Sequence, residues 1–148
     1  MRFEHVDEFQ VTGMAARTSN AIEMTGEGAI PQLWGQVTPP VDGPIGPIIA
    51  LYTEYESDEH GEYTFVLGGK SSSAREGVTV KTVPAGRYAV FTSERGPVQK
   101  VVVETWQRIW SELPSAKKLR TYVADFEVYD QRAADPANAV VDIYVGVK

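Results

Sequence analysis

The two halves of the sequence are predicted to contain the same elements in the same order. Each half, at about 8–70 and 86–148, follows the order strand, helix, strand, strand. The segment "IPQLWGQV" of the first half corresponds to "VVETWQRI" of the second, which places Trp34 opposite Trp106. Two units are too few for a solenoid, which needs at least about three. The order therefore predicts one α+β domain over 1–148, in which a duplicated unit forms an antiparallel sheet with two helices and a central ligand cleft along the seam.

Local patterns locate the strands and helices of each unit. The first helix is predicted to begin near Ala29, with Pro31 in its first turn, where the missing N–H does no harm. The second begins at Gly96-Pro97, carries apolar residues at helical spacing and stops at Pro114. The predicted strands are the β-rich runs "EFQVTGMAART", "GPIIALYTEYE", "GEYTFVLGGK", "GVTVKTVPAG", "GRYAVFTSE", "TYVADFEVYD" and "AVVDIYVGVK".

The composition excludes several classes of function. A net charge of −6 without a basic stripe argues against binding the nucleic-acid backbone. There is no cysteine, and the two histidines, His5 and His60, are far apart in sequence, which argues against thiol chemistry, a His-based metal site and a Ser-His-Asp triad. The start "MRFEHVDEF" lacks the apolar region of a signal peptide, and no window reaches the ~20 apolar residues of a membrane span. We therefore expect a cytoplasmic protein with no metal, no cofactor, no direct nucleic-acid partner and no membrane partner.

The strand "YVADFEVYDQ" contains an acid, Glu127, between apolar neighbours. Side chains alternate along a strand, so Glu127 and Tyr129 point to one face and Phe126 to the other. If Phe126 lines up with the valine-rich face of the last strand, Asp142 and Tyr144 share the face of Glu127. That face is either a solvated outer surface or the floor of the cleft, where the acid would lose hydration and a bound cation would compensate.

Two tryptophans on the second predicted helix also have two interpretations. Trp106 and Trp110 lie one helical turn apart on the apolar stripe. They either fill volume against the sheet or form an aromatic wall for a flat or cationic ligand. The two roles are compatible for different faces of one ring.

Characteristic segments spread over the whole chain resemble one family. In order, they are "GMAARTSN", "IPQLW", "YTFVLGG", "VPAGRYAVF", the helix with Trp106, and "DFEVYD". Together they resemble the gyrase-inhibitor-like small-molecule-binding domain, the effector-binding module of AraC-type and multidrug-sensing bacterial regulators. The resemblance implies a curved antiparallel sheet with two helices that enclose a pocket for hydrophobic, often cationic, compounds. We expect a stand-alone module, because the chain leaves no room for a DNA-binding helix-turn-helix.

The resemblance also implies the ligand-binding residues. In such domains an acid on a strand near the C-terminus commonly anchors the positive charge of the ligand, and the matching residue here is Glu127 of "DFEVYD". The weak first helix, with "TGEG" before "AIPQLW", departs from the pattern and implies a looser pocket on that side. With the aromatic residues around the acid, the expected ligand-binding set is Glu127, Trp106, Tyr144, Trp34, Tyr88, Tyr129 and Trp110.

Several functions fit these residues. The leading hypothesis is a binding protein for hydrophobic or cationic small molecules, with Glu127 as the countercharge. The alternative is a cofactor-free hydrolase of strained-ring (cyclopropanoid) genotoxins, in which a buried Glu127 is the general base and Tyr129 or Tyr144 orients the substrate. A third reading is a protein that binds a large enzyme such as gyrase through its acidic surface. The sequence leaves the ligand and a homodimer open.

Overall fold

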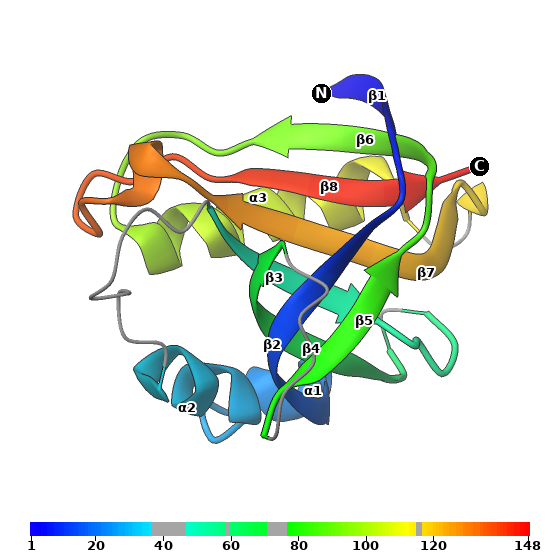
Figure 1. Cartoon of the computed structure of the whole chain (residues 1–148). Coiled ribbons are helices and arrows are strands. Elements are labelled where there is room, and N and C mark those ends of the chain that lie inside the picture. The colour runs from blue at the N-terminus through cyan, green and yellow to red at the C-terminus, as the bar shows by residue number, and fades with distance from the viewer. Residues whose placement is uncertain (37–46, 59, 71–76, 115–116) are drawn as a thin grey trace.

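The structure, a computed structural model, describes residues 1–36, 47–58, 60–70, 77–114 and 117–148. Within these residues the chain has the predicted α+β architecture, with an eight-stranded antiparallel sheet and helices beside it (Figure 1). None of the helices described is long and apolar enough to cross a membrane.

The elements agree largely with the predicted ones. The first long helix begins at Ala29 and the second directly after Pro97, as their sequence signals indicate. The first strand and the first short helix were not predicted, because their residues are mostly exposed and show little apolar periodicity. The strands are β1 (Arg2–Val6), β2 (Phe9–Ser19), β3 (Ile48–Thr53), β4 (Glu62–Lys70), β5 (Thr79–Val83), β6 (Gly86–Thr92), β7 (Arg120–Tyr129) and β8 (Asp142–Val147). The helices are α1 (Asn20–Glu23), α2 (Ala29–Gln36) and α3 (Val98–Glu112), with a 3₁₀ turn at Gln131–Ala133.

The strand order places the middle of the sheet between β7 and β3. The order is β1-β6-β8-β7-β3-β4-β2-β5, so β1 and β5 are the edges. Only residues 7 and 8 lie between β1 and β2, and only residues 84 and 85 lie between β5 and β6. The two strands of each pair are nevertheless far apart in the strand order. Such short connections require the sheet to curl strongly, as Figure 1 shows for the β1–β2 and β5–β6 ribbons.

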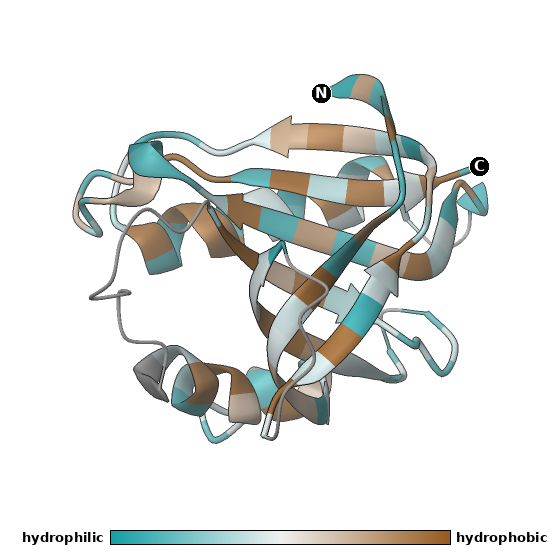
Figure 2. Ribbon diagram, viewed as in Figure 1, coloured by the Kyte–Doolittle hydropathy of each residue, from teal (hydrophilic) through white to brown (hydrophobic). Residues whose placement is uncertain are grey.

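One face of the sheet, which we call the helix face, packs against α2 and α3. Apolar residues recur along these elements, as the brown bands of Figure 2 show. The side chains of Tyr52 and Tyr129 pack against both helix-face clusters and so join them. The α3 cluster contains Ala89, Phe91, Trp106, Ile109, Leu113, Val141, Ile143, Val145 and Val147. The α2 cluster contains Leu33, Ala50, Tyr63, Phe65 and Leu67.

The register between β7 and β8 differs from the expected one. Phe126 pairs with Tyr144, and Glu127 pairs with Ile143. Residues directly opposite in an antiparallel pair share a face, so Tyr144 lies with Phe126 on the opposite face from Glu127. The expected grouping of Glu127 with Asp142 and Tyr144 is therefore wrong. Alternation within each strand was read correctly, but it does not determine how two strands slide against each other.

Candidate functional site

A buried carboxylate held by three neutral donors lies at the centre of the helix face. Glu127 is 2% exposed. The indole N–H of Trp106 donates to Oε2 at 2.6 Å, and the hydroxyl of Tyr52 donates to the same oxygen at 2.9 Å. The hydroxyl of Tyr129 donates to Oε1 at 2.6 Å. Each carboxylate oxygen is therefore satisfied without a charged partner.

Three different elements bring these groups together. Tyr129 is two residues along β7 from Glu127, so strand alternation puts both on one face. Tyr52 comes from β3, the neighbour of β7, where Ala50 stands directly opposite Glu127. The small Ala50 side chain leaves space above the strand pair for the carboxylate. Trp106 comes from the buried stripe of α3, which lays its ring over the same point.

The electrostatics of the site follow from burial without a countercharge. Among the described residues, no Lys, Arg or His forms an ion pair with Glu127. Burial raises the pKa of Glu127, and the bonds from Trp106, Tyr129 and Tyr52 offset only part of that rise. Burial also raises the pKa values of Tyr52 and Tyr129, and the neighbouring Glu127 carboxylate adds to both shifts. The carboxyl of Glu127 is thus held with a raised pKa and without a cationic partner among the described residues.

A pocket of about 460 Å³, which we call the helix-face pocket, opens directly above these donors. Tyr52 and Trp106 line it, whereas Glu127 does not, so the two rings separate the carboxylate from the pocket. The acid therefore lies just beneath an aromatic floor. Its lining includes apolar and aromatic side chains such as Ile30, Val102 and Trp110, together with the polar Glu23 and Arg120.

The structure brings most of the predicted site residues together. Trp110 lines the helix-face pocket, with its ring centroid 6.2 Å from that of Trp106. The ring of Trp34 meets that of Tyr129 edge-on, with their centroids 4.7 Å apart. Trp106 and Tyr129 thus contact Glu127 directly, whereas Trp110 and Trp34 pack behind them against their rings.

Two predicted site residues lie on the other side of the sheet. The ring of Tyr144 stacks on Phe126 at 4.6 Å with an interplanar angle of 8°. The ring of Tyr88 packs 5.4 Å from Phe126, and its hydroxyl donates to the Pro84 carbonyl at 2.8 Å. Burial raises the pKa of Tyr88 to about 12. Neither residue reaches Glu127, which the sheet separates from both.

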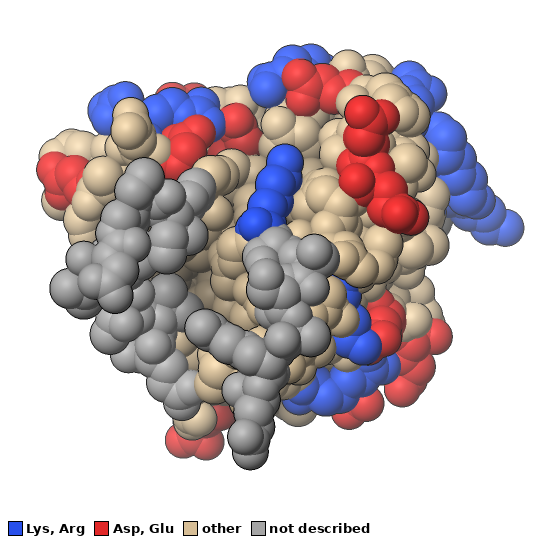
Figure 3. Space-filling model, viewed as in Figure 1, with Lys and Arg blue, Asp and Glu red and all other residues tan. Residues whose placement is uncertain are grey.

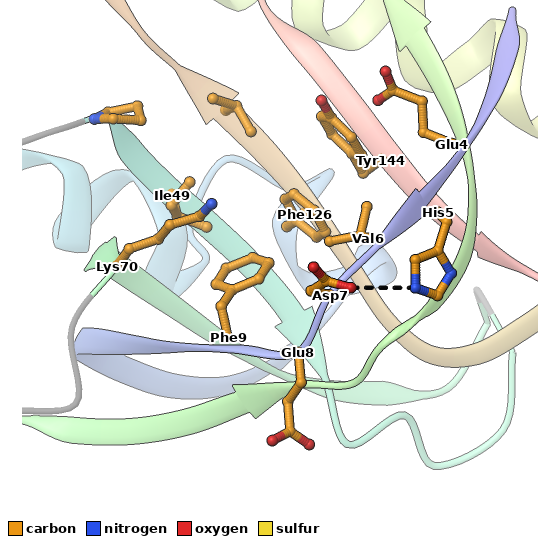
Figure 4. A pocket seen from close by; sticks show the side chains of 12 residues that line it. Glu4, His5, Val6, Asp7, Glu8, Phe9, Ile49, Lys70, Phe126 and Tyr144 are labelled. Atoms are coloured by element: carbon orange, nitrogen blue, oxygen red, sulfur yellow. Dashed lines mark ion pairs between the residues drawn. The ribbon is translucent and has the colours of Figure 1, made fainter.

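Tyr144 instead lines a pocket of about 470 Å³ on the opposite face (Figure 4). Phe9, Phe126 and Tyr144 form its aromatic side. Glu4 and Asp7 lie along β1 and its connection to β2, and Figure 3 shows acidic side chains gathered over that part of the surface. This pocket is distinct from the helix-face pocket, although β7 contributes to the surroundings of both.

The sequence reasoning missed a second polar centre beside the helix-face pocket. Arg120 and Asp125 form an ion pair at 2.6 Å, with side chains 2% and 0% exposed. The Tyr55 hydroxyl donates to the same Asp125 oxygen at 2.5 Å, and the Gly146 N–H donates to the other at 2.9 Å. Both charged residues stand in the run "RTYVAD", where charge next to β-type residues was an available signal.

Tyr52 is a further site residue that the sequence analysis does not identify. It stands in "LYTEY", where it alternates with the buried Leu51, and this pattern does indicate a face of the strand. Nothing in the sequence shows that this strand lies beside β7. Tyr52 and Glu127, which share a hydrogen bond, are 75 residues apart.

A family model matches residues 2–147, almost the whole chain, and describes an integron-associated effector-binding protein, Cass2. The chain belongs to this family. YobU of Bacillus subtilis strain 168, whose name assigns it provisionally to the transcriptional regulators, is 41% identical over 157 aligned positions. The alignment covers 97% of this chain and 95% of YobU.

Two solved structures share the fold of this chain. The integron cassette protein VCH_CASS2 of the Vibrio cholerae mobile metagenome superposes with a TM-score of 0.80 at 27% identity, over 99% of this chain and 95% of that one. SAV2435, solved bound to tetraphenylphosphonium, superposes with a TM-score of 0.75 at 15% identity, over 99% and 93% of the chains. At that identity the second match establishes a shared fold.

Proposed function

We propose that this effector-binding protein binds hydrophobic cations in the helix-face pocket, with Glu127 as the countercharge. The observation that carries the proposal is a carboxylate 2% exposed, bonded only to neutral donors, directly beneath an aromatic pocket. A buried acid without a cationic partner costs free energy, and a bound cation would recover it. The family and the cationic ligand of SAV2435 support this reading.

Binding would require the floor of the pocket to open. Because Tyr52 and Trp106 lie between the pocket and the carboxylate, the ligand's charge would act through the space those side chains now occupy. The aromatic walls would add dispersion and cation–π attraction, each about 1 kcal/mol or more when desolvated. The site would lie beside the β7–β3 pair. Apart from the short α1, the order β2-α2-β3-β4 matches β6-α3-β7-β8, which supports the predicted duplication.

The other predicted functions have less support. The hydrolase alternative has no support from the family description or from the relatives named above. A homodimer and a gyrase-like protein partner stay predictions. The ligand-binding roles of Tyr88 and Tyr144 do not form part of this proposal, because both lie across the sheet from Glu127.

The test uses two ions of nearly the same shape and opposite charge, tetraphenylphosphonium and tetraphenylborate. We expect tryptophan fluorescence and calorimetry to detect binding of the phosphonium and little binding of the borate. Glu127→Gln should weaken phosphonium binding at least about tenfold, because it removes one partner of a desolvated charge pair. Glu104→Gln, at an exposed acid on α3, is the matched control and should leave the affinity unchanged. Equal affinity of the phosphonium for wild type and Glu127→Gln would refute the countercharge role.

A further inference from the structure

A buried guanidinium with spare hydrogen-bond donors lines the helix-face pocket. Arg120 is 4% exposed and belongs to the pocket lining together with Tyr55 and Trp106. Its Nη2 donates to Asp125 at 2.6 Å. Its Nε and Nη1 are buried and have no hydrogen-bond partner among the described residues. Such unsatisfied buried donors are uncommon and are satisfied when an acceptor becomes available.

Aromatic rings hold this guanidinium in place. Its central carbon lies 4.4 Å from the ring centroid of Tyr122 and 5.9 Å from that of Trp106. Cation–π contacts of this kind stabilise the charge but do not replace a directed hydrogen bond. The unused donors of Arg120 therefore still favour an oxygen acceptor.

Trp106 places Arg120 and Glu127 next to the same ring. The indole N–H reaches Glu127 at 2.6 Å, and the ring neighbours the Arg120 guanidinium. Once the floor of the pocket opens, a flat molecule lying against Trp106 would thus have both the carboxylate and the unused donors beside the same ring.

The surrounding charges favour a neutral acceptor over an anion. The charge of Arg120 is already balanced by Asp125, and Glu23 also lines the pocket. A ligand carboxylate would therefore face Asp125, Glu23 and Glu127 with only one cation among them. A carbonyl oxygen accepts the same hydrogen bonds without that repulsion.

We infer that the helix-face pocket selects aromatic cations that also carry a neutral carbonyl acceptor, which Arg120 Nε and Nη1 bind while Glu127 faces the positive charge. This inference rests on the proposed function, because it names a second feature of the same ligand. It assigns Arg120 as a specificity-determining residue, separate from the countercharge.

Two commercial dyes isolate the acceptor. Tetramethylrosamine and tetramethylrhodamine methyl ester share one cationic ring system, and only the second carries an ester carbonyl. In wild type we expect the ester to bind about tenfold more tightly or better, as measured by fluorescence anisotropy, because hydrogen bonds from charged donors are among the stronger ones. The double variant Arg120→Met/Asp125→Asn removes the donors and the buried ion pair together, and in it the two dyes should bind with similar affinity.

Controls separate the inference from folding and from the proposed function. Asp125→Asn alone keeps the guanidinium and should retain the ester preference, as should Arg108→Met at an exposed position of α3. Circular dichroism verifies that the double variant folds. The inference is wrong, and the proposed function stands, if the rosamine binds through Glu127 but the ester dye binds no more tightly in wild type. The same holds if the double variant still binds the ester dye more tightly than the rosamine. If neither dye binds, or if Glu127→Gln leaves the affinity for both dyes unchanged, the inference and the proposed function are both contradicted.

Discussion

At the scale of the residue, Glu127 combines burial with satisfied hydrogen bonds and an unbalanced charge. Three neutral donors cover its oxygens, yet burial still raises the pKa of the carboxyl above its ordinary value near 4.5. Under the proposed function, a proton and a ligand cation compete for the same two oxygens. Affinity for cations should therefore fall as the pH drops through the raised pKa, and affinity for neutral compounds should not.

Without ligand, Glu127→Gln should gain stability relative to wild type as the pH rises, because the wild type loses stability over that range. Above pH 4.5 the unfolded chain releases this proton before the folded protein does, so the folded state binds more protons and the free energy of unfolding decreases with pH. That decrease, at most about 1.4 kcal/mol per pH unit, ends once the pH exceeds the raised pKa. The uncharged Gln lacks this dependence. Urea unfolding of wild type, Glu127→Gln and the control Glu104→Gln at several pH values measures the difference, and parallel curves for all three would show an ordinary pKa at Glu127.

At the scale of the element, β7 directs successive side chains to separate environments. Glu127 and Tyr129 enter the centre of the helix face, while Phe126 joins Tyr144 and Phe9 on the opposite face. The strand also begins at Arg120, whose pair with Asp125 spans an irregularity in the β7–β8 ladder. Among the described residues, β7 therefore carries three of the four buried charged side chains, Arg120, Asp125 and Glu127.

The two tyrosines provide a matched test of which face binds cations. Tyr129→Phe removes the 2.6 Å donor from Glu127, raises the pKa of the acid further and should weaken tetraphenylphosphonium binding several-fold near the titration midpoint. Tyr144→Phe should leave the affinity unchanged, because that ring lies across the sheet. Calorimetry at two pH values measures both variants. A larger loss in Tyr144→Phe than in Tyr129→Phe would move the cation site to the opposite face.

The ion pair at the start of β7 predicts an asymmetry between single and double variants. Arg120→Met leaves Asp125 buried without its cation and should lower the free energy of unfolding by about 3–5 kcal/mol. Arg120→Met/Asp125→Asn removes both charges and should recover much of that loss, since the Asn oxygen can accept from the Gly146 N–H and its NH2 group can donate to the Tyr55 hydroxyl oxygen. Denaturant unfolding compares the variants. Equal losses in the two would mean that the pair is not coupled.

At the scale of the whole molecule, the two helix-face clusters are joined. Tyr52 and Tyr129 pack against both the α2 and the α3 cluster, and the β3–β7 ladder connects the two parts of the sheet. The site lies at that junction, so its geometry depends on both clusters. We expect the protein to unfold as one cooperative domain.

Phe91→Ala tests this cooperativity. The side chain is fully buried in the α3 cluster, and its removal should lower the free energy of unfolding by about 3–5 kcal/mol. Far-UV circular dichroism and tryptophan fluorescence, which reports Trp34 on α2 as well as Trp106 and Trp110 on α3, should show coincident transitions. Two separate transitions would indicate halves that unfold independently.

The α+β class, the type of most elements and the acid at the site follow from the sequence by itself. Strand alternation and helical spacing are local, so they identify β7, α3 and the shared face of Glu127 and Tyr129 without knowledge of the fold. The partners of Glu127 from distant segments, and the register that removes Tyr144, were decided by tertiary structure. Tyr52 meets Glu127 because β3 pairs with β7, and Tyr144 is excluded because β8 pairs one residue away from the expected alignment. A shift of one residue transfers every side chain of a strand to the other face, and only the packing of the whole sheet determines which register is stable.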